Sequence, residues 1–291
     1  MSSRTANLSR FGLSIAVAGF VGFLMVGCGN SQADAKKYVD SGNALVEQGK
    51  LSEAIADYNK AVEINPKDAE TYDKLGTALV QENKLPEATE AFKKAIEANP
   101  KKIELYSKLA LIQVNQKKLD EASATFQKAI EVDPKNAKIY NNLGFIQVNQ
   151  GKIPEATDSF KKSLAIDPNN AKTHKDLGVA LGLQNNLKEA TAAFKKSIEL
   201  DPKSADAHYF LGIALVKQGN LPEGVASLKK ATEIEPKAAQ AYFNLGVALD
   251  QQGKKSESIA AIKKARDLLR EQGRTQDADK IDEGLKAMGQ K

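Results

Sequence analysis

The chain has one cysteine, two histidines and no tryptophan among its 291 residues. With Cys28 as the only cysteine, an intramolecular disulfide and a cysteine-based zinc cage are both excluded. The formal net charge is only +5, and without clustered, uncompensated cations there is no general drive to bind nucleic acid. The sequence contains no P-loop, GxGxxG, GxSxG or HExxH motif. We therefore expect no enzyme, no catalytic residue, no cofactor, no metal and no small-molecule substrate.

Long hydrophobic runs are also scarce, and the one that occurs lies near the N-terminus. Arg4 and Arg10 precede a charge-free run of 17 residues from Phe11 to Gly27. This length is at the short end for a transmembrane helix. A basic start followed by an apolar run and small residues is typical of a secretory signal. We therefore predict a signal peptide over residues 1–27 and an exported protein.

The end of this run, Met25-Val26-Gly27-Cys28, resembles the lipobox of bacterial lipoproteins. Gly27 and Cys28 fit, whereas Met25 stands where Leu is usual and Val26 where Ala or Ser is usual. The resemblance implies cleavage before Cys28, lipid on its sulfur, a short tether over residues 28–34, and a membrane-anchored protein facing the periplasm or outer surface. Two alternatives stay open: cleavage after Ala33, which would release a soluble protein, and an uncleaved anchor.

Prolines recur at a fixed interval through the rest of the chain. Six of them lie 34 residues apart, and we set them as position 32 of a 34-residue unit. These prolines are Pro66, Pro100, Pro134, Pro168, Pro202 and Pro236. Seven units result, starting at residues 35, 69, 103, 137, 171, 205 and 239.

Other positions of the unit repeat in the same way. Position 4 is Tyr or His, position 8 is Gly or Ala, and positions 20 and 27 are small. Position 24 is large, and in four of the seven units it is Phe. Small residues let two helices approach closely, while the large residue fills the space between them. This pattern resembles the tetratricopeptide repeat (TPR) signature and covers residues 35–272.

The resemblance implies an all-α fold, a right-handed α-solenoid of seven TPR helix hairpins. The first helix of each hairpin should end at a Gly or Asn in the left-handed conformation, with Lys117 as a mildly strained exception. The seventh repeat has no closing proline, so its second helix should continue to about Glu271. Residues 273–291 should form a capping helix, since a solenoid otherwise exposes the apolar side of its last repeat. Its apolar face would consist of Ala278, Ile281, Leu285 and Met288.

Neither a metal site at the two histidines nor the chaperone-tail clamp of some TPR proteins is expected here. His174 and His208 occupy the aromatic packing position of consecutive repeats. Such equivalent points lie about 8–10 Å apart, too far to share a metal. The nearest match to the clamp that grips chaperone tails fits only two of five positions; it would consist of Ser107, Leu111, Asn142, Lys172 and Asp176.

In TPR arrays the first helices line a concave groove, and the resemblance implies that positions 2, 5, 9 and 12 face a ligand. The groove should be acidic in repeats 2 and 3, through Glu70, Asp73 and Glu104, and basic and amide-rich in repeats 4 and 5. Position 9 is apolar from Leu111 onward. The alternative is that these apolar groups contact neighbouring helices. The predicted partner-binding residues are Lys138, Asn141, Phe145, Lys172, Lys175, Val179, Tyr209, Ile213, Phe243 and Val247.

These features predict a non-catalytic protein–protein interaction scaffold tethered to a bacterial envelope membrane. It would bind peptide segments of a protein partner in the concave groove and reach the membrane through lipid on Cys28. The alternative is a soluble periplasmic, chaperone-like binder of unfolded or extended segments. TPR lipoproteins that this chain resembles serve as pilus-assembly factors or as scaffolds for cell-wall enzymes, and the sequence does not choose between them.

The resemblance at Cys28 generates the first testable prediction. The wild-type protein should partition into membranes, because each buried CH₂ of an acyl chain contributes about 0.8 kcal/mol. Cys28→Ser should not be lipidated. Intact-mass analysis of the mature protein checks both. A product that begins at Asp34 and carries no lipid would rule out the lipoprotein.

Overall fold

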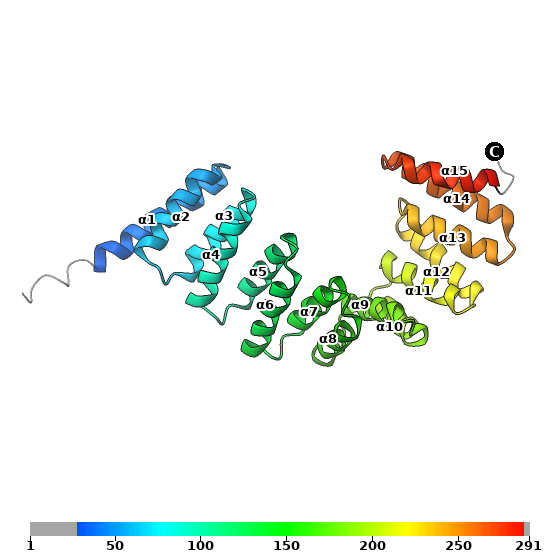
Figure 1. Cartoon of the computed structure of the whole chain (residues 1–291), viewed down its shortest axis with the longest axis horizontal. Coiled ribbons are helices and arrows are strands. Elements are labelled where there is room, and N and C mark those ends of the chain that lie inside the picture. Colours follow the sequence, from blue (N-terminus) through cyan, green and yellow to red (C-terminus); the bar gives the residue numbers. More distant parts are fainter. Residues whose placement is uncertain (1–27, 288–291) are drawn as a thin grey trace, which may run out of the picture.

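The computed structural model describes residues 28–287, and within that range all regular structure is helical. Fifteen helices follow one another along an arc (Figure 1). Their bounds are α1 Cys28–Glu47, α2 Leu51–Ile64, α3 Ala69–Gln81, α4 Leu85–Ala98, α5 Ile103–Asn115, α6 Leu119–Val132, α7 Ala137–Asn149, α8 Ile153–Ile166, α9 Ala171–Leu183, α10 Leu187–Leu200, α11 Ala205–Lys217, α12 Leu221–Ile234, α13 Ala239–Gln251, α14 Lys255–Glu271 and α15 Thr275–Ala287.

Consecutive helices pair into hairpins, and each hairpin packs against the next. This arrangement confirms the predicted α-solenoid. From the second repeat to the seventh, the first helix starts at the residue predicted from the proline spacing, 69, 103, 137, 171, 205 and 239. The predicted signal peptide of residues 1–27 lies outside the described residues. Residues 28–34, expected as a tether, are helical and belong to α1.

Each first helix ends at a residue in the left-handed conformation. Glycine takes this place in four hairpins, as at Gly151 with φ +73°, and Asn83 and Asn185 take it in two others. Lys117 takes it in repeat 3 with φ +61°. The left-handed conformation predicted for Lys117 is therefore confirmed, and the Cβ of a lysine makes this conformation less favourable than it is for glycine. The second helices α4, α8 and α12 contain proline in their first turn, as expected.

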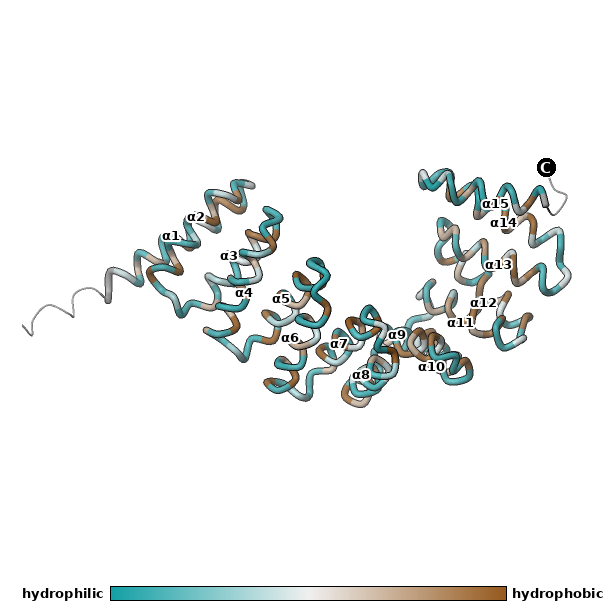
Figure 2. The backbone as a smooth tube through the Cα atoms, viewed as in Figure 1, coloured by the Kyte–Doolittle hydropathy of each residue, from teal (hydrophilic) through white to brown (hydrophobic). Residues whose placement is uncertain are grey.

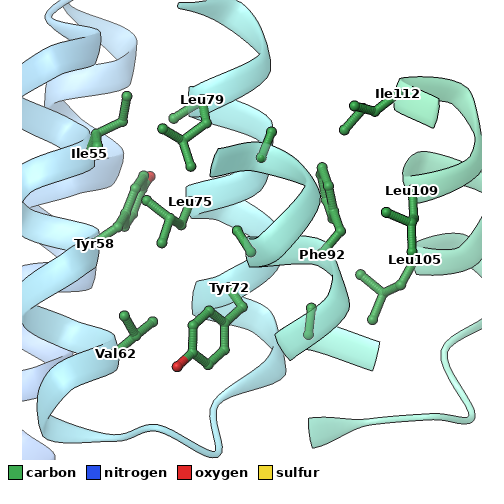
Figure 3. Close-up of a cluster of buried hydrophobic side chains, with 14 of the residues drawn as sticks. Ile55, Tyr58, Val62, Tyr72, Leu75, Leu79, Phe92, Leu105, Leu109 and Ile112 are labelled. Atoms are coloured by element: carbon green, nitrogen blue, oxygen red, sulfur yellow. The ribbon is translucent and has the colours of Figure 1, made fainter. Parts of the chain in front are cut away.

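The core repeats along the array, since each hairpin buries one apolar face against its neighbour. Figure 3 shows one such unit, in which Tyr58 of α2, Leu75 of α3, and Phe92 of α4 lie between successive helices. Figure 2 shows hydrophobic and hydrophilic residues alternating along the helices. The described residues therefore form a chain of linked clusters, in which stability depends on contacts between neighbouring repeats.

Within a hairpin, the closest approach is between position 8 and position 24. A Cβ built on Gly76 would lie 2.8 Å from the Phe92 ring, and one built on Gly178 would lie 2.5 Å from the Phe194 ring. A similarly close contact occurs in six of the seven repeats, with a ring in four of them and with Leu228 or Ile262 in the other two. The ring lies directly on the backbone of the first helix, and this contact needs glycine.

The C-terminal helix α15 covers the end of the array. Ala278 and Leu285 are fully buried and Ile281 is partly buried against Leu268 and Leu269 of α14. Met288, the fourth predicted contact, lies outside the described residues. Arg266 of α14 also pairs with Asp282 of α15 at 3.0 Å. As expected, α14 continues to Glu271.

The glycine–ring contact predicts the effect of a single methyl group. Gly178→Ala should destabilise the protein by about 1–3 kcal/mol, because the new Cβ overlaps the Phe194 ring. Denaturation followed by circular dichroism would measure this loss.

A matched control lies four residues further along the same helix. Nothing lies within 4 Å of a Cβ added at Gly182, so Gly182→Ala should leave stability unchanged or raise it by up to about 1 kcal/mol. Equal stability of the two variants would contradict the packing role of Gly178.

Candidate functional site: the face of the first helices

All ten predicted partner-binding residues lie on the first helices of repeats 4 to 7, that is on α7, α9, α11 and α13. Their exposure differs. Phe145 and Val247 are 54% and 37% exposed, and Lys138 and Lys172 are also exposed. Asn141 is buried. The others, Lys175, Val179, Tyr209, Ile213 and Phe243, are partly buried.

The predicted basic part of this face carries less free charge than the sequence suggests. The ammonium group of Lys172 lies 3.2 Å from a carboxylate oxygen of Asp176, and that of Lys175 lies 3.0 Å from Asp206 of α11. Both lysines are therefore neutralised within the array. Lys138 differs, because its ammonium group makes no ion pair with any residue in the described range.

Asn141 connects two repeats instead of facing outward. Its side-chain amide donates to Thr173 Oγ1 at 3.1 Å and to Asp176 at 3.3 Å, and its Oδ1 accepts from Lys172 at 3.2 Å. A buried amide with all these partners fixes the position of α9 on α7. The amide-rich character predicted for this part of the face thus serves packing between repeats.

Tyr209 connects repeats in a similar way. Asn244 of α13 donates to its hydroxyl oxygen at 2.8 Å, and the Phe210 ring lies edge-on at 5.1 Å. Tyr209 and Ile213 pack against the buried cluster around Leu228 and Leu249, and burial raises the pKa of the Tyr209 phenol. Tyr209 also lines a small cavity of about 140 Å³ with Asp206 and Gln240, among others. Tyr209 thus holds repeat 7 on repeat 6, and its contact with a partner stays a prediction.

Two of the three acidic residues expected to face the groove in repeats 2 and 3 are also paired with lysines. Asp73 is nearly buried and accepts from Lys102 at 3.0 Å and from Lys108. Burial raises the pKa of Asp73, but the two ammonium groups outweigh it and hold the pKa below its ordinary value. Glu70 pairs with Lys74 at 3.4 Å, whereas Glu104 is exposed and forms no ion pair among the residues that the structure describes.

The most exposed apolar surface lies at repeats 3 and 4. Leu111 of α5 is 62% exposed and, with Phe145, lines a cavity of about 380 Å³. The remaining lining residues are Ser107, Ala110, Val114, Phe126, Asn142, Ile146 and Lys172. The apolar residue at position 9 indicated Leu111, but no pattern in the sequence indicated that a cavity forms beside it. Leu183 of α9, exposed and one turn after Val179, was also not predicted.

The histidines have structural partners. The His174 ring Nε2 lies 2.9 Å from the carbonyl oxygen of Pro168, and His208 Nε2 lies 3.2 Å from that of Pro202. Tyr106 and Tyr140 donate to the equivalent proline carbonyls. In repeats 3 to 6, position 4 therefore ties the repeat to the closing turn of the one before. No cluster of three or more His, Cys, Asp or Glu suited to a metal, and no helix long and apolar enough to cross a membrane, occurs within residues 28–287.

Two family models match the chain. The model for the C-terminal domain of cilia and flagella-associated protein 70, a TPR domain by its name, matches residues 13–241. A tetratricopeptide repeat model matches residues 211–272. The chain belongs to the tetratricopeptide repeat family. This family is generally a non-catalytic interaction fold, so the TPR array described here is a protein-interaction scaffold.

Solved structures agree on the fold. MamA is 25% identical with a TM-score of 0.54, over 57% of this chain and 97% of MamA. YrrB, described as a TPR protein with an unusual peptide-binding site, is 26% identical with a TM-score of 0.53, over 63% of this chain and 95% of YrrB. A TPR protein from Parabacteroides merdae ATCC 43184 is 16% identical with a TM-score of 0.62, over 86% and 98% of the two chains, and shows the fold alone. No curated protein gives a significant match.

The environment of Asp73 predicts a pH-dependent contribution to stability. Its pKa is lower in the folded than in the unfolded protein, so its charged form stabilises the fold above the unfolded value of about 3.9, and this contribution is lost as pH falls through the folded value. Asp73→Asn should destabilise by about 1 kcal/mol at pH 7. The difference from wild type should shrink below about pH 4.

Urea denaturation at pH 7 and below about pH 4 would measure the difference in stability between Asp73→Asn and wild type. Glu104→Gln is the matched control, because Glu104 lies on the same face without an ion pair among the described residues. A loss in Glu104→Gln as large as in Asp73→Asn would show that the lysine pairs of Asp73 are not responsible.

Proposed function

We propose that the chain is a scaffold held on a bacterial envelope membrane by lipid on Cys28, and that it binds peptide segments on the face of the first helices. The observation that carries the binding part is the exposed apolar surface of this face. Leu111, Phe145 and Val247 occupy position 9 of three repeats, and each exposes more than a third of its surface. Packing of the array does not use this exposed area, and contiguous exposed apolar groups rimmed by polar ones often mark binding sites.

The comparisons support this proposal to a limited extent. YrrB is described as having a peptide-binding site, and its sequence is 26% identical to this one. This similarity supports the proposal that the present chain also binds peptides. Aromatic and aliphatic side chains that exclude water typically dominate the affinity of such interfaces. We therefore expect Phe145 to contribute more to partner affinity than the paired lysines Lys172 and Lys175.

The membrane part rests on the lipobox resemblance. Cys28 belongs to α1, the first helix of the first repeat. In helical form, residues 28–34 span about 10 Å. The same residues fully extended would span more than twice that length. With lipid on Cys28, the first repeat would lie close to the bilayer, and the array would project its later repeats away from the attachment point.

A capture experiment tests the binding proposal. The wild-type protein and the double variant Phe145→Ala, Val247→Ala would be used to capture partners from a detergent extract of the native cell, followed by mass spectrometry. The partner recovered with wild type should fall more than tenfold with the double variant, because two exposed apolar contacts are removed. Circular dichroism should be unchanged.

The matched control is the double variant Val132→Ala, Ile166→Ala. These residues are each 38% exposed, similar to Val247, but they lie at the ends of the second helices α6 and α8. Equal loss of the partner in both double variants would contradict binding on the first helices. Release of the mature protein into the soluble fraction with Asp34 at its N-terminus would favour the soluble chaperone-like binder.

A further inference from the structure

Repeat 3 departs from the other six repeats at position 8. Six repeats have glycine there, and the side chain at position 24 lies so close that an added Cβ would come within 2.5–2.8 Å of it. Repeat 3 has Ala110 instead, facing Phe126. The alanine methyl group occupies the space that the ring uses in the other hairpins, so Phe126 cannot lie on the backbone of α5 in the same way.

The consequence is a looser hairpin. α5 and α6 are in close contact along less of their length than the two helices of any other hairpin. Beside this hairpin, on the face of the first helices, lies the cavity of about 380 Å³ described above, whose lining comes mainly from α5 and α7. Phe126 and Val114 line it together with Ala110, and the exposed side chains of Leu111 and Phe145 lie beside them. Pockets of this size accommodate small ligand groups, and an apolar lining favours an apolar side chain.

The polar residues near the cavity favour an anion. Asn142 and Lys172 line it, and Lys138 lies one helical turn before Asn142 on the same side of α7. Asp176 compensates Lys172, whereas Lys138 has no ion pair within the described residues. The surroundings of the cavity therefore combine an apolar interior with one uncompensated positive charge.

We propose that this cavity, opened by Ala110, is the anchor site for the partner. It takes one large apolar side chain of a peptide segment, and a carboxylate nearby on the same segment pairs with Lys138. The proposal rests on the proposed function, peptide binding on the first helices, and locates its centre at repeats 3 and 4 within the wider set of residues predicted on repeats 4 to 7. Residues at the centre of an interface that fill a dry pocket typically carry most of its affinity.

The test uses a library of random peptides displayed on phage and selected against the wild-type protein. Selected sequences should share a Leu, Phe or Met within four residues of an Asp or Glu. Synthetic fluorescent copies are then titrated by anisotropy. Ala110→Gly should lower affinity more than tenfold, because Phe126 can then lie on α5 as in the other hairpins and the cavity closes. Phe145→Ala should have a similar effect without changing the hairpin.

Two further variants separate the charge from the cavity. Lys138→Gln should weaken binding two- to fivefold and reduce its dependence on salt, because the lost contact is an exposed ion pair. Ile166→Ala, outside the first-helix face, should bind as wild type does. Melting followed by circular dichroism should show that Ala110→Gly is at least as stable as wild type, so that a loss of affinity is not a loss of fold.

The outcomes distinguish this inference from the proposed function. Peptides whose affinity is unchanged by Ala110→Gly and Phe145→Ala but falls with Tyr209→Ala or Val247→Ala would overturn the anchor site and leave first-helix binding intact. Binding that is insensitive to all four variants would overturn both. If the selected peptides lack an acidic residue, or if their affinity is insensitive to Lys138→Gln, the proposed pairing of a peptide carboxylate with Lys138 is overturned.

Discussion

The array depends on a close contact within each hairpin between the first helix and a large side chain at position 24 of the second, and in six of the seven repeats that side chain lies against a glycine backbone. In these six repeats a Cβ on the glycine would come within 2.5–2.8 Å of the side chain, so a larger residue would force the two helices apart. The alanines at position 20, such as Ala88, Ala122 and Ala156, have no exposed surface. Close packing within the hairpins lets each one bury its apolar face against the next, and the stacked hairpins form the solenoid.

Polar bonds then fix one hairpin on the next. Gln184, at the end of α9, donates to Thr157 Oγ1 of α8 at 2.6 Å, and Gln218 makes the equivalent bond to Thr191 at 2.7 Å. At the other end of the first helix, in repeats 3 to 6, the residue at position 4 bonds to the carbonyl of the preceding closing proline. The first helices α9 and α11 are therefore held at both ends by the repeat before them. Apolar contacts supply most of the stability, while these bonds fix the relative orientation of neighbouring repeats.

The fold could be predicted because its determinants lie close together in sequence. The proline spacing fixed the start of the first helix in six repeats, and the left-handed residues, including Lys117, were identified by chemistry alone. The candidate site was less predictable. Lys175 and Asp206 lie 31 residues apart, and Tyr209 and Asn244 lie 35 apart, so their pairing depends on how neighbouring repeats turn relative to one another. Residue type indicated which side chains were polar or apolar, but not which would neutralise each other.

Repeat 3 contains both departures from the pattern, Ala110 and the left-handed Lys117. The first loosens its hairpin, and the second adds strain to its turn. In a linear array whose repeats contact only their neighbours, the repeat with the weakest internal contacts deforms most under an applied force. Under tension applied between its two ends, this array would therefore bend or extend first at its third repeat, with the stiffer repeats on either side moving as blocks.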